Sequence, residues 1–145
     1  RIEDGRNPIV AHEFLGSSVE GKDVIIIDDM ISSGDSILET AAALKQRKAG
    51  KIFVFSTFGL FTGGLEKFDR AYESGLITRI LTTNLIYQTP ELLKREWYIN
   101  CDMSKYIAYI IDTLNHDSSI SDLLNPNERI QSIVTKYRNG EPLTN

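Results

Sequence analysis

The feature that most constrains the fold of this chain is a regular alternation of short apolar runs with segments of helical pattern. Residues 24–27 form a continuous aliphatic run, which is typical of a strand buried on both faces of a sheet. Further apolar runs predict strands at residues 52–57, 77–83 and 97–101. Strands separated by helices form βαβ units. Their right-handed crossovers predict an α/β fold with a mainly parallel sheet flanked by helices on both faces.

Hydrophobic residues at helical spacing predict four helices. They are expected at residues 36–47, in a segment that begins near Leu65 and closes at Gly75, at residues 103–114, and after residue 125. The last helix has Asn125 as its cap and Pro126 at its first position. Its buried side is predicted to consist of Ile130, Ile133, Val134 and Tyr137.

The start of the chain differs in composition from the rest. Residues 1–8 are polar and rich in turn formers, which is typical of an entry into the middle of a longer protein. We interpret residues 1–8 as a polar lead-in and expect a short strand at residues 8–14. Because the sequence shows no internal repeat or low-complexity tract, residues 1–145 are predicted to form a single domain.

Charge and composition exclude several kinds of partner. The formal net charge is −4 and the basic residues form no block, so neither nucleic acid nor an anionic membrane is expected as a partner. No apolar run approaches the length that spans a bilayer. Cys101 is the single cysteine, which excludes an internal disulfide and favours a reducing, cytoplasmic location.

Two adjacent acids, Asp28 and Asp29, follow the first aliphatic run. Their carboxylates repel each other and are costly without partners; ligand hydroxyls and a divalent cation are the natural partners. Successive strand residues point to opposite faces, so both acids reach one ligand only if the chain turns there. Ligands of parallel sheets bind beyond the carboxyl ends of the strands, which directs attention to the loops after residues 27, 57 and 83.

A run of small polar residues separates this acidic pair from the next helix. Ser32, Ser33, Gly34 and Ser36 offer hydroxyl side chains and backbone amides. A helix start carries unpaired N–H groups and a partial positive charge, so it accepts phosphate. The sequence therefore predicts a ligand with two ends: sugar hydroxyls at the acids and a phosphate at the amides.

Other catalytic and binding motifs are missing from the sequence. It contains no G-x-x-x-x-G-K-[ST] phosphate loop, no G-x-G-x-x-G fingerprint and no H-E-x-x-H zinc helix. His12 and His116 are interpreted as surface or structural residues. A receiver domain of two-component signalling would need a phosphoryl-accepting aspartate at the end of a later strand. The predicted strands that end at residues 57 and 83 have none.

The segment VIIIDDMISSGDS (residues 24–36) resembles the phosphoribosyl pyrophosphate (PRPP) loop of type I phosphoribosyltransferase folds. Downstream segments narrow the resemblance to ribose-phosphate diphosphokinases, also called PRPP synthetases. STFGLFTGG (56–64) is similar to their THGLFSG segment, LTTN (81–84) to their VTN strand end, and DMSKYIAYIIDTLNHDSSIS (102–121) to the helix and segment that follow. The match runs in order from about residue 21 to residue 124.

The resemblance implies a reaction in which the anomeric hydroxyl of ribose 5-phosphate attacks the β-phosphorus of Mg-ATP, giving PRPP and AMP. By carry-over, Asp28 and Asp29 hold the ribose hydroxyls, with Mg2+ assisting as cofactor. The 5-phosphate is implied to lie among Ser32, Ser33, Gly34, Asp35 and Ser36. The resemblance also implies a C-terminal domain whose N-terminal partner half supplies much of the ATP and magnesium site. We therefore expect this chain alone to bind ribose 5-phosphate or PRPP weakly without catalysing transfer.

Three positions depart from the pattern of that family. Ser32 stands where aspartate is usual, Asp35 stands where glycine is common, and Phe58 replaces the histidine of THG. The Asp35 carboxylate would repel phosphate unless its side chain points away. Weaker binding or a turned-out side chain is the expected consequence.

Two other functions stay open at this point. A nucleobase phosphoribosyltransferase that uses PRPP would need a hood for base specificity, of which the sequence gives no clear sign. A non-catalytic regulatory homologue associated with PRPP synthetases is kept open by the three departures. The resemblance further implies a homo-oligomer, either a dimer or a hexamer. Within it, Ser119 and Ser121 are implied to contact an allosteric ADP or phosphate site, or else to form a turn between helices.

Overall fold

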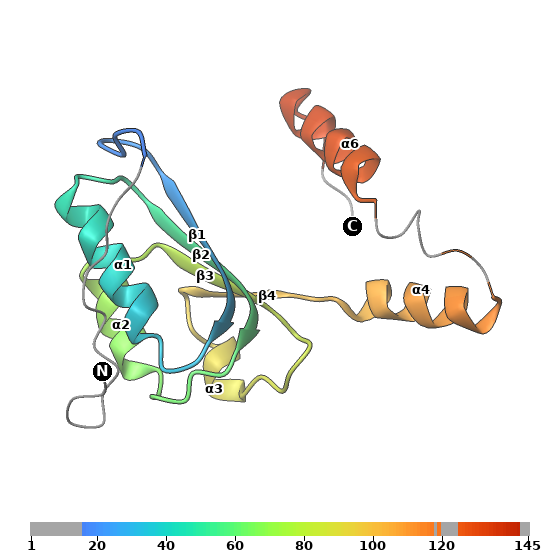
Figure 1. Ribbon diagram of the computed structural model, residues 1–145, viewed down its shortest axis with the longest axis horizontal. Coiled ribbons are helices and arrows are strands. Elements are labelled where there is room, and N and C mark those ends of the chain that lie inside the picture. The colour runs from blue at the N-terminus through green and yellow to red at the C-terminus, as the bar shows by residue number, and fades with distance from the viewer. Residues whose placement is uncertain (1–15, 118, 120–124, 143–145) are drawn as a thin grey trace. The chain divides into compact units, whose positions relative to one another are not determined.

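The computed structural model describes residues 16–117, 119 and 125–142 (Figure 1). The chain divides into two compact units, one that ends at Asp102 and one that begins at Met103. The elements of the first unit are β1 (Val24–Ile31), α1 (Asp35–Gln46), β2 (Ile52–Gly59), α2 (Glu66–Glu73), β3 (Arg79–Thr83), α3 (Pro90–Leu93) and β4 (Tyr98–Cys101). Those of the second are α4 (Ser104–Asn115) and α6 (Asn127–Arg138). The predicted strand at residues 8–14 and the lead-in at 1–8 lie outside the described residues.

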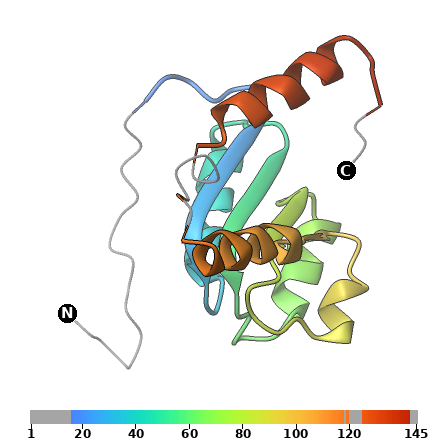
Figure 2. The same cartoon turned by 90° about the vertical axis from the view of Figure 1, so that its right-hand side faces the viewer.

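The first unit contains one parallel sheet with the strand order β1-β2-β3-β4. This confirms the predicted α/β fold with a parallel sheet flanked by helices. The strands are added in one direction, so right-handed crossovers place the connecting helices on the same face. α1 and α2 do lie together on one side of the sheet (Figures 1 and 2). The first unit therefore differs from the expectation of helices on both faces.

The core lies between this face of the sheet and the two helices. Every second residue of β2 and β3 points inward and is buried: Ile52, Val54, Ser56, Ile80 and Thr82. α1 and α2 complete the core with Ile37, Ala41, Leu44, Phe68 and Ala71. Burial of this apolar area on one face is the main stabilising contribution to the unit.

Aromatic rings fill the core near the carboxyl ends of the strands. Phe68 is fully buried; its ring centroid lies 5.1 Å from that of Phe61 and 5.6 Å from that of Trp97. The Trp97 indole N–H donates a 2.6 Å hydrogen bond to the Asp69 carboxylate. Buried tryptophans need such a partner, so Asp69 allows the largest side chain of the core to be enclosed.

The opposite face of the sheet is exposed in the described residues. Ile25 and Ile27 are 60% and 82% exposed, and Phe55 and Ile99 also point to this side. The prediction that residues 24–27 are buried on both faces is therefore wrong. A continuous aliphatic run normally indicates two covered faces, but here the crossover helices all cover the other side.

The described part of the second unit contains two helices, and apolar side chains of both are exposed. In α4, Ile111 and Leu114 are 61% and 60% exposed, and in α6 Ile130, Ile133 and Tyr137 are exposed. The predicted buried side of the last helix is thus wrong for these residues: α4 has no buried residue, and the two described helices of this unit, 12 residues each, are too short to enclose a core between them. None of the described helices is long and apolar enough to span a membrane.

The predicted ends of several elements shift by a few residues. The last helix begins at Asn127 rather than Pro126, yet the Asn125 side chain still accepts a 3.3 Å hydrogen bond from the Asn127 amide. β1 continues to Ile31 instead of ending at residue 27, because its backbone pairs with β2 as far as Gly59. This longer strand changes the geometry of the acidic pair.

Candidate functional site

The candidate site is built on the end of β1, the loop that follows it, and the first turn of α1. The chain leaves the sheet after Ile31 and enters α1 through Gly34, which has φ +89° and ψ 0° and takes the N-cap position. A helix start at Ser36 was predicted, so the helix begins one residue earlier. An ideal Cβ on Gly34 would lie 2.1 Å from Cζ of Phe68. Glycine is therefore required twice, by the left-handed backbone and by the ring beneath it.

The acidic pair lies within β1 and not beyond it. Asp28 is half-buried and pairs in register with Ser56, whereas Asp29 is exposed. The Asp29 amide donates a 2.8 Å hydrogen bond to Oδ1 of Asp28. Because the strand continues to Ile31, successive side chains alternate between its faces. The turn that would direct both carboxylates to one ligand is not present at this point of the chain.

Asp28 is the acid that lies beside the loop. A hollow of about 120 Å3 is lined by Asp28 and by loop and helix residues that include Ser32, Ser33, Gly34 and Ser36. Asp29 does not line it. The structure thus brings one predicted acid and the predicted phosphate loop together and leaves the second acid on the other side of the strand.

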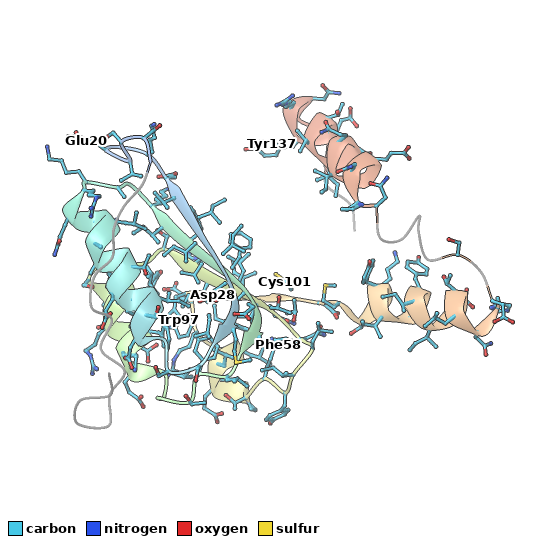
Figure 3. The ribbon with its side chains drawn as sticks, in the orientation of Figure 1. Glu20, Asp28, Phe58, Trp97, Cys101 and Tyr137 are labelled. Atoms are coloured by element: carbon cyan, nitrogen blue, oxygen red, sulfur yellow. The ribbon has the colours of Figure 1, made fainter. Side chains whose placement is uncertain are left out.

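Asp28 also borders a second hollow, of about 180 Å3, at the carboxyl ends of the strands. Its lining includes Ile27, Thr57, Thr83 and Cys101. Residues 27, 57 and 83, where the strands are predicted to end, therefore border one hollow, but β1 and β2 continue past them to Ile31 and Gly59, so strand residues rather than loops line it. Figure 3 shows Asp28, Phe58 and Cys101 near one end of the sheet, with Glu20 at the opposite end.

A larger hollow, of about 410 Å3, lies at the amino ends of the strands beside Glu20 and Lys48. These two residues already form a 2.8 Å ion pair. Since ligands of parallel sheets bind at the carboxyl ends, we place the site in the two smaller hollows that share Asp28.

The Asp35 carboxylate is turned toward its own loop. The Ser33 hydroxyl donates to Asp35 Oδ2 at 2.8 Å, and the Lys67 ammonium donates to Asp35 Oδ1 at 2.6 Å. Asp35 is thus neither a phosphate ligand in this conformation nor turned away from the loop. Lys67 belongs to α2 and is not among the residues predicted from the sequence. One signal for it exists: an acid within a phosphate-binding loop needs a cation nearby to balance its charge.

Two other residues border this loop from β2 and the turn that follows. Thr62 Oγ1 lies 3.4 Å from Ser32 Oγ, so the hydroxyls of two loops meet. Phe58, at the position where the diphosphokinases that this sequence resembles have histidine, is half-buried and pairs in register with Met30. The replacement of a polar ring by a packed one agrees with this position in the strand.

The Asp28 carboxylate has acceptor positions that fit a magnesium ion shared with a substrate, whereas Asp29 lies on the other face of the strand. Mg2+ is usually held by one or two carboxylates, with substrate phosphates and water supplying the rest. The Asp28 carboxylate accepts one amide hydrogen bond, and a carboxylate has about four acceptor positions. Within the described part of the chain no group of three or more His, Cys, Asp or Glu side chains could hold a metal alone. The acidic side chain at the loop therefore fits a metal ion that binds together with the substrate.

Cys101 lines the second hollow, and burial raises the pKa of its thiol. The thiolate is the nucleophile, so at a given pH less of it is present than for a free thiol. We expect the rate of alkylation by iodoacetamide to rise with pH around a midpoint above that of the same thiol in the unfolded chain. Because Cys101 is the only cysteine, mass spectrometry of the intact chain measures this directly. In urea the midpoint should return to that of the free thiol; a native midpoint at or below it would contradict the prediction.

The predicted regulatory residues can be described only in part. Ser119 is exposed, and Ser121 lies outside the described residues. A contact of this segment with an allosteric site therefore stays a prediction.

Comparisons with known proteins agree with one another. The family model described as "Phosphoribosyl synthetase-associated domain" matches residues 8–125. The ribose-phosphate pyrophosphokinase of Shewanella oneidensis is 32% identical over 103 residues, 71% of this chain and 32% of that protein. The same enzyme of Thermococcus kodakarensis is 40% identical over 81 residues, 54% of this chain and 29% of that protein. This chain spans about a third of the length of the relatives it matches.

A solved structure has the same fold. The crystal structure of phosphoribosylpyrophosphate synthetase from Mycobacterium smegmatis matches with a TM-score of 0.62 at 21% identity. The match covers 71% of this chain and 33% of that one. It supports the predicted type I phosphoribosyltransferase-like architecture.

Proposed function

Because this chain belongs to the phosphoribosyl synthetase-associated domain family, we propose that it is the ribose-5-phosphate-binding domain of a ribose-phosphate diphosphokinase. The whole protein would transfer diphosphate from Mg-ATP to the anomeric hydroxyl of ribose 5-phosphate, giving PRPP and AMP. One observation carries the proposal: Asp28 and the loop from Ser32 to Gly34 line a single hollow at the carboxyl edge of a parallel sheet. That hollow joins an acceptor for sugar hydroxyls to a loop and helix start suited to phosphate.

The phosphate end of the ligand is assigned to the loop and the first turn of α1. The hydroxyls of Ser32, Ser33 and Ser36 and the backbone amides of this turn are donors, and the helix adds a partial positive charge. Gly34 allows the left-handed turn that leads the loop into α1. Hydrogen bonds to a charged group contribute roughly 1.5–3 kcal/mol each, so several of them hold a phosphate monoester.

The sugar end is assigned to Asp28 in the first place. Its carboxylate accepts hydrogen bonds from ribose hydroxyls and borders both hollows. Asp29, on the other face of the strand, is assigned a smaller part in binding. Mg2+, when bound with substrate, would neutralise charge on the transferred diphosphate, and we assign Asp28 to hold it, because Asp29 lies on the other face of the strand. Transfer also needs cations around the diphosphate. We therefore expect this third of the enzyme to bind without transferring.

The test is a calorimetric titration of the 145-residue chain with ribose 5-phosphate in the presence of Mg2+. We expect Asp28→Asn to weaken binding at least tenfold, because the negative charge is lost and one acceptor oxygen becomes a donor amide, and Asp29→Asn to weaken it less. Glu20→Gln removes the same charge at the opposite end of the sheet and should leave binding unchanged. Equal effects of Asp28→Asn and Glu20→Gln would overturn the assignment.

Two assays address transfer itself. The complete parent protein should release AMP from ATP in the presence of ribose 5-phosphate, and Asp28→Asn should lower that rate. Appreciable AMP release by the 145-residue chain alone would contradict the expectation that it only binds.

A second candidate is a non-catalytic homologue that joins diphosphokinase assemblies. The observation that favours it is the Asp35 carboxylate, which takes up donors of the phosphate loop. If the full-length parent binds ribose 5-phosphate at this loop but releases no AMP, the non-catalytic homologue is supported over the enzyme.

A further inference from the structure

Two charged residues from different elements meet over the phosphate loop. Asp35 begins α1, and Lys67 lies in the first turn of α2, 32 residues along the chain. Their side chains form a 2.6 Å ion pair, and the same carboxylate accepts the 2.8 Å hydrogen bond from Ser33. One carboxylate therefore engages both a hydroxyl and an ammonium group beside the hollow assigned to phosphate.

Lys67 is held in place beside the loop. Its side chain is only 22% exposed, against 64% for that of Asp35. An ideal Cβ on Gly63 would lie 3.0 Å from Lys67 Nζ and 3.4 Å from the Ser33 carbonyl oxygen. The end of the lysine side chain thus lies against Gly63, and a side chain at residue 63 would crowd it.

The two residues present opposite charges to an incoming phosphate. A carboxylate at this position repels a phosphate dianion, whereas an ammonium group attracts it. Water screens the Asp35 side of the ion pair, which is the more exposed one, so a dianion with several donors can replace that carboxylate. Asp35 has the exposure that allows its side chain to leave, and Lys67 has the fixed position that suits a ligand.

We propose that Asp35 competes internally with phosphate for Ser33 and Lys67, and that Lys67 binds the phosphate once Asp35 is displaced. The inference rests on the proposed function and adds to it a phosphate-binding cation and a residue that limits affinity. Asp35 occupies the donors when the loop is empty. The ligand recognised is a phosphate monoester, with ribose 5-phosphate as the member of that class expected here.

One single variant and one double variant test the competition by calorimetry at constant ionic strength. The titrants are ribose 5-phosphate, inorganic phosphate and ribose. We expect Asp35→Asn to bind both phosphates about tenfold more tightly, because the repulsion and the competition are both removed. Asp35→Asn with Lys67→Gln should lose most of that gain, and the response to ribose should not change.

Two control variants separate competition by the Asp35 carboxylate from a general effect of removing one negative charge. Glu66 is an exposed acid next to Lys67, and Glu66→Gln removes a charge near the loop without touching the Asp35 pair. It should change the affinity less than twofold. Glu20→Gln removes an acid from the ion pair at the far end of the sheet and should have no effect. Trp97 fluorescence confirms that each variant is folded.

A measurement on the unsubstituted chain does not depend on variants. Saturation with inorganic phosphate should shift the carbon-13 resonance of the Asp35 carboxyl group, because its partners leave. A constant resonance at saturation would overturn the inference. So would an Asp35→Asn affinity equal to that of the unsubstituted chain, or a double variant as tight as Asp35→Asn alone.

The proposed function fails in a different way. If ribose 5-phosphate binds the unsubstituted chain and the Asp35 and Lys67 variants with equal affinity, the proposed competition is wrong and the assignment of the site stands. If none of them binds ribose 5-phosphate, both are wrong.

Discussion

Replacing Gly34 with alanine is expected to lower the free energy of unfolding by about 3 kcal/mol and to abolish detectable ribose 5-phosphate binding. The left-handed backbone costs an L-residue roughly 1–2 kcal/mol, and overpacking adds roughly 1–3 kcal/mol. The overpacking arises because the new Cβ would meet the Phe68 ring at 2.1 Å. Urea unfolding followed by Trp97 fluorescence measures the stability, and calorimetry measures the binding.

Gly75 offers a matched control for this substitution. It has φ +71°, and an ideal Cβ there meets nothing within 4 Å. Gly75→Ala should therefore cost only the backbone strain, about 1 kcal/mol, and leave binding unchanged. Phe68→Leu should make Gly34→Ala less costly, since a smaller side chain leaves room for the methyl group. Equal costs for Gly34→Ala and Gly75→Ala would contradict the clash.

Replacing Phe68 with alanine is expected to lower the free energy of unfolding by roughly 3–5 kcal/mol, the range for large-to-small changes of buried aromatic residues. Phe68 is fully buried and its ring contacts Phe61 and Trp97, so the change leaves a cavity that these rings cannot fill without moving. Urea unfolding followed by circular dichroism measures the effect, because the fluorescence of Trp97 itself should change.

Phe55 provides the control for that loss. It is 37% exposed on the open face of the sheet, and Phe55→Ala should cost within about 1 kcal/mol. The Phe68→Ala variant should also bind ribose 5-phosphate more weakly, since the ring supports Gly34 from below. A Phe68→Ala variant as stable as Phe55→Ala would show that the aromatic core does not stabilise the unit as the structure indicates.

The parts of the fold that depend on local patterns could be predicted from the sequence. The aliphatic and aromatic runs gave the four parallel strands, and the contiguous residues from Ser32 to Ser36 gave the loop and helix start. A phosphate-binding loop can be predicted from the sequence because its hydrogen-bond donors are neighbours in the chain. The length of β1 was not readable, since aspartates disfavour strands and only pairing with β2 extends the strand through them.

The part of the site that depends on tertiary packing could not be predicted. Lys67 and Thr62 reach the loop from a segment about 30 residues away in sequence, and no local pattern indicates that approach. The division of Asp28 and Asp29 between two faces follows from the strand continuing, which changes the predicted pair into one acid at the loop and one on the other side.

The order of the strands has a consequence for how the domain assembles. Each strand pairs with the strand that follows it in sequence, so adding a strand to the sheet closes one loop of chain. The first of these steps joins residues about 28 positions apart, Val24 and Ile52, so the pairing of these parallel strands is non-local and pays a loop-closure cost before it is stabilised. The unit β1-α1-β2 contains Asp28 and the loop from Ser32 to Gly34. During synthesis the ligand-binding loop therefore emerges with its own first strand pair, ahead of β3 and β4.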